Sequence, residues 1–306
     1  MWKKLLQARI WRRIYLERLG EPLLYNLASL IVLIFGSFSK KIDYDLVPRQ
    51  PYAFGLKTAF TEAKSIGVKK VVIIEFGVAS GAGLFNLAFI AKKLSIELDI
   101  DYEIIGFDSG KGMPKPLDYR DHPEKYGYGD FPPLGLCPEG LPEKTRLIIG
   151  DIASSLPEYE KKLDLHSRIA FVSIDVDYYS STKDCLSIFT GPQSIYLPRV
   201  VIYLDDVNNI DHNQYCGELL AVSEFNSKDS PRKICKMTQL RNWRIFKNAL
   251  WLDQMYFLHI LDSDYRRPEF QNRREIVKLF NPYESNISDM LEDNKSTDVV
   301  RGVWGC

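Results

Sequence analysis

Apolar residues gather in five short runs along the middle of the chain, each rich in Val and Ile. The runs lie at 71–76, 102–108, 146–151, 169–176 and 200–206. A half-exposed strand alternates apolar and polar residues, whereas these runs are nearly continuous, which is typical of strands buried on both faces. The segments between them are long enough to carry helices. The pattern therefore predicts a mainly parallel sheet covered by helices.

Three helices and two further strands are predicted around these five runs. The clearest helix is expected at 84–94, and a second is expected to run to 189 with Ser180 or Ser181 as its cap. A third helix is predicted at 217–225, and the runs 234–240 and 255–261 add two strands. The sequence thus predicts an α/β protein with a sheet of about seven strands.

The rest of the chain differs in composition from this core. We expect residues 1–50 to form an N-terminal helical arm, 51–267 the α/β domain, and 268–306 a C-terminal tail without apolar periodicity. The segment 110–142 is rich in Pro and Gly and is predicted to be a long loop. A loop of this length inside a compact domain is usually functional or disordered. Its segment 120–126 could close over substrate as a lid, and an ordinary surface loop is the alternative.

The N-terminal arm combines a basic stretch with an uncharged one. Apolar side chains alternate with the basic residues Lys3, Lys4, Arg9, Arg12, Arg13 and Arg18. No residue in 22–39 is charged, but the polar and helix-breaking residues in that stretch argue against a bilayer span. Three roles stay open for 1–39: peripheral contact with a membrane surface, contact with the second subunit of a homodimer, or packing on its own domain.

Charge and cysteine content exclude some functions. Lys and Arg total 40, as do Asp and Glu, so no global positive field would attract nucleic acid. The five cysteines are odd in number and form no C-x-x-C pair, so neither a disulfide framework nor a zinc site is expected. These features favour a cytoplasmic protein, which would lie at the inner face of a membrane if the arm binds lipid.

A glycine-rich turn follows the first predicted strand at once, in the sequence EFGVASGAG of 75–83. Glycine lets the backbone approach a ligand closely, and the start of the next helix presents free N–H groups. The spacing fits neither a dinucleotide fingerprint nor a phosphate loop, and it is closer to the turn of class I methyltransferases. A purely structural turn is the alternative. The residues expected to contact a cofactor here are Glu75, Gly77, Val78, Ser80 and Gly81.

Acidic residues close the next two predicted strands. Asp108, followed by Ser109, ends the second strand, and Asp151 ends the third. Ligands of open α/β sheets bind outside the carboxyl ends of the strands. An acidic residue that ends the second strand can there accept hydrogen bonds from the hydroxyl groups of a ribose. We expect Asp108 and Ser109 to bind the cofactor. Asp151 either reaches its adenine or caps the following helix.

Carboxylates also stand in pairs where the fourth and fifth predicted strands end. Asp175 and Asp177 follow one strand, and Asp205 and Asp206 follow the other. Converging carboxylates repel one another, and a hard divalent cation is the ordinary way to hold them ionised and close. Mg²⁺ fits oxygen ligands best. Helix capping or surface charge is the alternative for either pair alone.

These segments have the order and spacing of a known family. Residues from about 70 to 226 resemble the macrocin O-methyltransferase family of metal-dependent sugar methyltransferases, in the segments 75–78, 106–109, 112–114, 174–182, 204–206, 217 and 221–225. The resemblance implies a seven-stranded, Rossmann-like class I methyltransferase sheet and S-adenosylmethionine as the methyl donor, with Asp175 also near it. It further implies Mg²⁺ bound by Asp175, Asp205 and Asp206, and Asp177 as a candidate general base. Gly110 and Lys111 replace the family's usual Phe-Glu, so the acceptor stays unnamed.

The spacing of Asp177 from Asp175 also suits a general base, independently of the family resemblance. On an extended chain it lies roughly 7 Å beyond Asp175 and on the same side, close enough to serve the same substrate. His122 and His212 are the alternatives.

The sequence thus predicts a metal-assisted O-methyltransferase that acts on a hydroxyl of a small molecule or saccharide. Two other functions stay open. Asp175-Val-Asp177 could hold the metal and nucleotide diphosphate of a glycosyltransferase, although this leaves the turn at 75–83 unexplained. The second open function is that of a non-catalytic, membrane-associated module that has the same fold but no methyl transfer.

Overall fold

The computed structural model describes residues 14–132, 140–164, 166–209 and 211–267. The start of the predicted basic arm, part of the predicted loop at 110–142 and the predicted tail at 268–306 lie outside the described residues. Contacts divide the chain into one compact unit, Met1–Ser263, and a second, Asp264–Cys306. The sheet and the arm both belong to the first unit. Among the described helices, none combines the length and the apolar character needed to cross a membrane.

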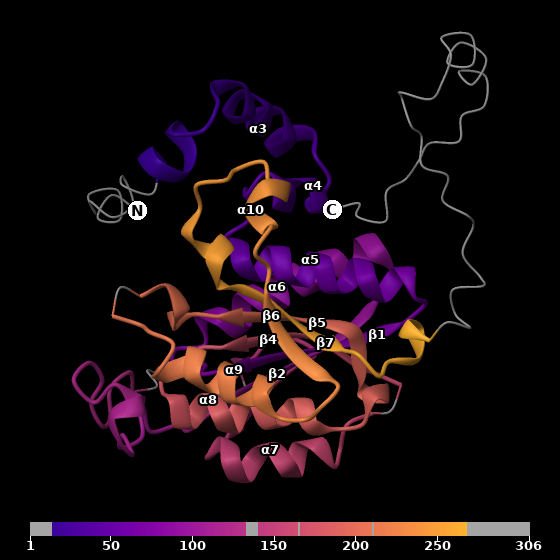
Figure 1. Ribbon diagram of the computed structural model, residues 1–306. Helices are drawn as coiled ribbons and strands as arrows, with labels where there is room; N and C mark the ends of the chain where they lie inside the picture. Colours follow the sequence, from indigo (N-terminus) through magenta and orange to yellow (C-terminus); the bar gives the residue numbers. More distant parts are fainter. Residues whose placement is uncertain (1–13, 133–139, 165, 210, 268–306) are drawn as a thin grey trace, which may run out of the picture. The chain divides into compact units, whose positions relative to one another are not determined.

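One seven-stranded sheet forms the centre of the first unit (Figure 1). Its strands are β1 (Lys70–Phe76), β2 (Asp101–Asp108), β3 (Thr145–Ile149), β4 (Arg168–Ile174), β5 (Tyr196–Leu204), β6 (Arg232–Lys236) and β7 (Met255–Ile260). Their order is β3-β2-β1-β4-β5-β7-β6. β7 runs antiparallel to β5 and β6, and the other neighbours are parallel. This is the strand arrangement of the class I methyltransferase fold, so the predicted fold class is confirmed.

Helices cover both faces of the sheet. The α-helices of the described residues are α3 (Leu23–Phe35), α4 (Phe38–Asp43), α5 (Gln50–Ser65), α6 (Ala82–Leu98), α7 (Ile152–Glu160), α8 (Tyr179–Cys185), α9 (Gly217–Ser227) and the short α10 (Leu240–Trp243). Figure 1 shows α5 and α6 on one face and α7, α8 and α9 on the other. Figure 1 also shows α3 and α4 beyond α5, on the side away from the sheet.

Side chains of β1 show why the apolar runs are continuous. Val71 and Ile73 belong to the apolar core under α5 and α6, whereas Val72, Ile74 and Phe76 belong to the core under α7, α8 and α9. Successive side chains of a strand point to opposite faces, so a strand with a helix layer on each side needs apolar residues throughout.

Several strands end earlier than the sequence predicts. β3 stops at Ile149 and β4 at Ile174, so Asp151 and Asp175 lie beyond their strands. β5 stops at Leu204, which frees both following aspartates from the alternation of a strand. β6 ends at Lys236, and Leu240, predicted to end that strand, instead begins α10.

Gly55 lets α5 pack directly against β4. A methyl group at this position would lie 2.3 Å from Cε2 of Phe171. We expect Gly55→Ala to lower the free energy of unfolding by about 1–3 kcal/mol, the usual cost of overpacking, measured by urea denaturation. Gly140→Ala is the control, because nothing lies within 4 Å of the added methyl there. Equal stability of the two variants would contradict this close packing.

Candidate active site

A cavity of about 840 Å³ opens at the carboxyl edge of the parallel strands. It lies where the strand order reverses between β1 and β4, which is where open α/β sheets bind ligands. The predicted site residues that line it are Gly77, Asp108, Ser109, Asp151, Asp175, Asp177, Asp205 and Asp206. Those that are not part of its lining are Glu75, Val78, Ser80, Gly81, His122 and His212.

Gly77 is the point at which the turn after β1 touches the end of β4. Its φ is 81°, and a Cβ atom there would lie 1.8 Å from the backbone oxygen of Asp175. Glycine is therefore required here for both conformation and space. The turn predicted to bind a cofactor and the first carboxylate of the predicted metal site are thereby fixed against each other.

Glu75 lies beneath the turn and is only 2 % exposed. Its Oε1 accepts a hydrogen bond of 2.7 Å from the Tyr52 hydroxyl, which lies 3.0 Å from Oγ of Ser173. Burial raises the pKa of Glu75 to about 7. A Cβ atom on Gly83 would lie 1.8 Å from Glu75 Oε1, so this carboxyl group also fills the space under the start of α6. Its predicted contact with a cofactor stays a prediction.

Asp108 holds the same turn from the end of β2. Its Oδ2 accepts hydrogen bonds from the backbone N–H groups of Val78 and Ala79, at 2.9 and 2.8 Å. Its Oδ1 accepts a third bond, 2.8 Å long, from the N–H of Gly110. A carboxylate has about four lone-pair positions. Asp108 therefore orders the turn and still has capacity for a ligand hydroxyl at the cavity wall.

Two further candidates have local partners as well as positions in the cavity lining. The Ser109 hydroxyl donates to the backbone oxygen of Gly112 at 2.9 Å. Asp151 is the N-cap of α7 and accepts from the N–H of Ala153 at 3.3 Å. The capping alternative for Asp151 is thus present in the structure, and its place in the lining leaves contact with adenine open.

Three carboxylates converge beside this turn. One oxygen from each of Asp175, Asp177 and Asp206 lies within 4.8 Å of the other two. Asp177 has a φ of 61°, a left-handed conformation that Asp tolerates better than most residues. The predicted set contained Asp205 in place of Asp177. Asp205 lines the cavity, but its Oδ1 accepts a short hydrogen bond from the hydroxyl of Tyr203.

The electrostatics of this cluster favour a cation. Burial, with repulsion from Asp205 and Asp177, raises the pKa of Asp175 well above its usual value. Burial and repulsion from Asp206 raise the pKa of Asp177 to about 7. Asp206 Oδ2 is buried and has no hydrogen-bond partner. Closely spaced carboxylate oxygens with unused lone pairs are a donor set that fits Mg²⁺.

The two candidate histidines lie together behind Asp206. Their rings stack with centroids 4.9 Å apart, and Nε2 of His212 lies 4.0 Å from Asp206 Oδ1. Burial, with Lys125 and His122 nearby, lowers the pKa of His212 to about 4, so its ring is neutral and weakly basic. Of the three predicted bases, Asp177 is the one in the cavity lining.

Tyr126, which the sequence placed only in a possible lid, contacts the carboxylate cluster. Its hydroxyl donates to Asp206 Oδ1 at 3.1 Å, and its backbone oxygen accepts from the Tyr178 hydroxyl at 3.3 Å. The segment around it had been predicted as part of a lid. A contact across 80 residues leaves no local pattern that could have revealed this role.

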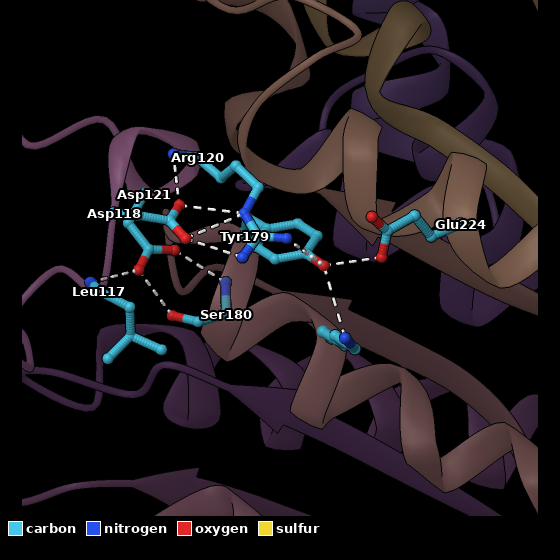
Figure 2. A network of polar contacts seen from close by, with 8 residues as sticks. Leu117, Asp118, Arg120, Asp121, Tyr179, Ser180 and Glu224 are labelled. Carbon is cyan, nitrogen blue, oxygen red and sulfur yellow. Dashed lines mark hydrogen bonds and ion pairs between the residues drawn. The ribbon is translucent and has the colours of Figure 1, made fainter.

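The same loop is fastened to α8, as Figure 2 shows. Asp121 accepts from the N–H groups of Ser180 and Leu117, both at 2.8 Å, and from the Ser180 hydroxyl at 3.0 Å. The prediction that Ser180 or Ser181 caps this helix was wrong: the helix begins at Tyr179, and the loop supplies the acceptor. The Arg120 guanidinium donates to the Tyr179 hydroxyl at 3.2 Å, which extends the attachment.

No protein-family model and no curated protein matches the chain. It is similar to the calicheamicin methyltransferase CalS11, with 19% identity and a TM-score of 0.47 over 68% of this chain and 77% of that one. For the O-methyltransferase NovP the identity is 16% and the TM-score 0.46, over 69% and 79% of the chains. For the plantazolicin methyltransferase BpumL, solved with SAH, the identity is 13% and the TM-score 0.30, over 72% of this chain and 89% of that one.

Asp121 offers a test of how the loop is held. We expect Asp121→Asn to lower the free energy of unfolding by about 1.5–3 kcal/mol, because the buried side chain of Asp121 loses the charge that its N–H and hydroxyl partners donate to. Hydrogen exchange over 111–131 should accelerate. Asp118→Asn is the matched control, because Asp118 pairs with Arg120 at the surface and its loss should change little. Unchanged exchange in Asp121→Asn would show that the loop is held by other contacts.

Proposed function

We propose that this protein is an S-adenosylmethionine-dependent O-methyltransferase, assisted by a divalent cation and acting on a hydroxyl of a small molecule or saccharide. One observation carries the proposal: the turn after β1, the acid ending β2 and the carboxylate cluster after β4 and β5 line a single cavity. A cofactor site beside a metal site would serve metal-assisted methyl transfer to oxygen, because the cation would activate a hydroxyl next to the methyl donor. The cavity volume of about 840 Å³ lies in the range of small-molecule sites.

The cofactor half of the cavity supports a nucleoside ligand. Asp108 retains acceptor capacity at the end of β2, where a ribose would lie, and Gly77 allows close approach of the backbone. Asp151 stands at the end of β3 and could accept from an adenine amino group. The carboxylates near the turn would also favour the positive sulfonium centre of the cofactor.

The metal half supports Mg²⁺ as the cation. By geometry Asp175, Asp177 and Asp206 would hold it, whereas the sequence resemblance assigns Asp205 in place of Asp177. When bound, the cation would lower the pKa of an acceptor hydroxyl and stabilise the alkoxide. Tyr126, by donating to Asp206, positions one of these carboxylates from the loop side.

The chain's own residues would chiefly position the acceptor. Methyl transfer is a direct displacement, so holding the hydroxyl in line with the sulfonium methyl group contributes most to the rate. Tyr126, Tyr128 and Phe131 present aromatic side chains to the cavity, against which a sugar or other ring can pack. Asp177 is the carboxylate best placed to take the proton if it is not a ligand, a step usually worth about 10² to 10⁴ in rate.

Cofactor identity is tested by calorimetry with the metal-free protein. S-adenosylhomocysteine should bind and uridine diphosphate should not, and Asp108→Ala should weaken binding at least tenfold because it removes charge-assisted bonds worth about 1.5–3 kcal/mol. Asp101→Ala is the control, at the opposite end of β2. Tight binding of uridine diphosphate in the presence of Mn²⁺, with none of S-adenosylhomocysteine, would instead support the glycosyltransferase.

Metal binding should depend on pH in a defined direction. Carboxylates must lose their protons to bind a cation, and the metal-free pKa of Asp177 is about 7. Mg²⁺ should therefore raise the unfolding temperature more at pH 8 than at pH 5.5, and Asp177→Asn should flatten this difference. Asn suits the left-handed backbone at this position.

Two single variants show whether Asp177 or Asp205 is the third ligand of the metal. If Asp177 is a ligand, Asp177→Asn loses the response to Mg²⁺ at pH 8 and Asp205→Asn keeps it. The reverse result would restore Asp205 as the ligand and leave Asp177 as the base. No response of the wild-type protein to Mg²⁺, Mn²⁺ or Ca²⁺ would contradict a metal site.

A further inference from the structure

The helix α3 exposes an unusual amount of apolar surface. Seven apolar side chains on two neighbouring faces are between 52% and 82% exposed: Leu23, Leu27, Leu30 and Ile34 on one face, and Leu24, Ile31 and Phe35 on the other. The two faces are rotated by roughly 100° from each other. Ser29 is the one buried residue of the helix. Exposed apolar area of this kind marks a surface that meets a partner or a membrane.

The segments before and after α3 are hydrogen-bonded to each other and to the rest of the unit, so the exposure is not that of a loose terminus. Arg18 donates to the backbone oxygens of Tyr44 and Asp45, at 2.8 and 2.9 Å, and its guanidinium lies 3.9 Å from the ring centroid of Phe246. Arg244 donates to Asp45 Oδ1 at 2.7 Å. The polar side of the arm is therefore satisfied by its own domain, and the apolar side is presented outward.

The charges around α3 indicate which partner fits. No residue in 22–39 is charged, so the exposed faces offer nothing to a polar or charged protein surface. The sequence before it is basic, with no acidic residue ahead of Glu17. Basic residues next to an apolar helix match the anionic headgroups and acyl chains of a cytoplasmic leaflet. Trp243, in the segment that holds the arm, is 63% exposed, and Trp favours the membrane–water boundary.

We infer that α3 inserts into the headgroup region of an anionic lipid bilayer and anchors this protein to the membrane surface. A helix of 13 residues is about 20 Å long, short of the roughly 30 Å hydrocarbon core, so it would lie at one leaflet. Lipid covers both apolar faces at once, whereas a second copy of the chain packed on one face leaves the other in water. The inference is independent of the proposed methyl transfer, because membrane binding needs neither cofactor nor turnover.

Flotation with the full-length protein tests the anchor directly. The wild-type protein should float with vesicles of phosphatidylcholine and phosphatidylglycerol, less with phosphatidylcholine alone, and less again as salt is raised. Ile34→Glu should lower partitioning at least tenfold, because it puts a charge on an exposed side chain that would enter the apolar part of the bilayer. Replacing Lys3 and Lys4 with Gln should lower it roughly fivefold for each residue.

Ile96→Glu is the matched control. Ile96 is 75% exposed on α6, and its replacement should leave flotation unchanged. Unfolding temperatures of Ile34→Glu and Ile96→Glu should equal that of the wild type, since both side chains are exposed. Failure of the wild-type protein to float would overturn the anchor. So would an equal loss in Ile96→Glu, or a lipid-free dimer in sedimentation that Ile34→Glu dissociates.

Discussion

Buried carboxylates that repel one another stand at the carboxyl edge of β4 and β5. Asp175, Asp177 and Asp206 are close enough to share one cation, and Glu218 accepts from the backbone N–H of Asp206 behind them. Burial and mutual repulsion raise the pKa of each above its usual value. Either protons or a divalent cation must relieve this repulsion, and only the cation keeps all the oxygens available as ligands and acceptors.

The parts that surround these carboxylates hold them in place and connect them to the cofactor turn. Gly77 packs against the backbone oxygen of Asp175, and Asp108 fixes the same turn through backbone N–H groups. From the other side, Tyr126 bonds to Asp206 while Asp121 fastens the loop to α8. The turn, the carboxylates and the loop therefore behave as one assembly. A cofactor that moves the turn would be expected to alter the carboxylates, and a metal would be expected to steady the loop.

The sequence predicted the sheet well because its evidence was local. Continuous apolar runs such as 71–76 require a helix layer on both faces, and the acids that follow them mark strand ends. The same logic placed Asp108, Asp175 and Asp206 at one edge. Local sequence patterns could not predict contacts between distant segments. The loop acid Asp121 capping α8 across 59 residues and Tyr126 bonding to Asp206 depend on how the loop folds back, which no spacing encodes.

The central claim is that one cavity holds the methyl donor beside a divalent cation. Nuclear magnetic relaxation of ¹³C-methyl S-adenosylmethionine, bound to the protein with Mn²⁺ in place of Mg²⁺, measures that proximity directly. We expect strong paramagnetic relaxation of the bound methyl carbon by Mn²⁺, absent with Mg²⁺ and lost in Asp206→Asn. Binding of both ligands to the wild-type protein without such relaxation would place them in separate sites and contradict the account.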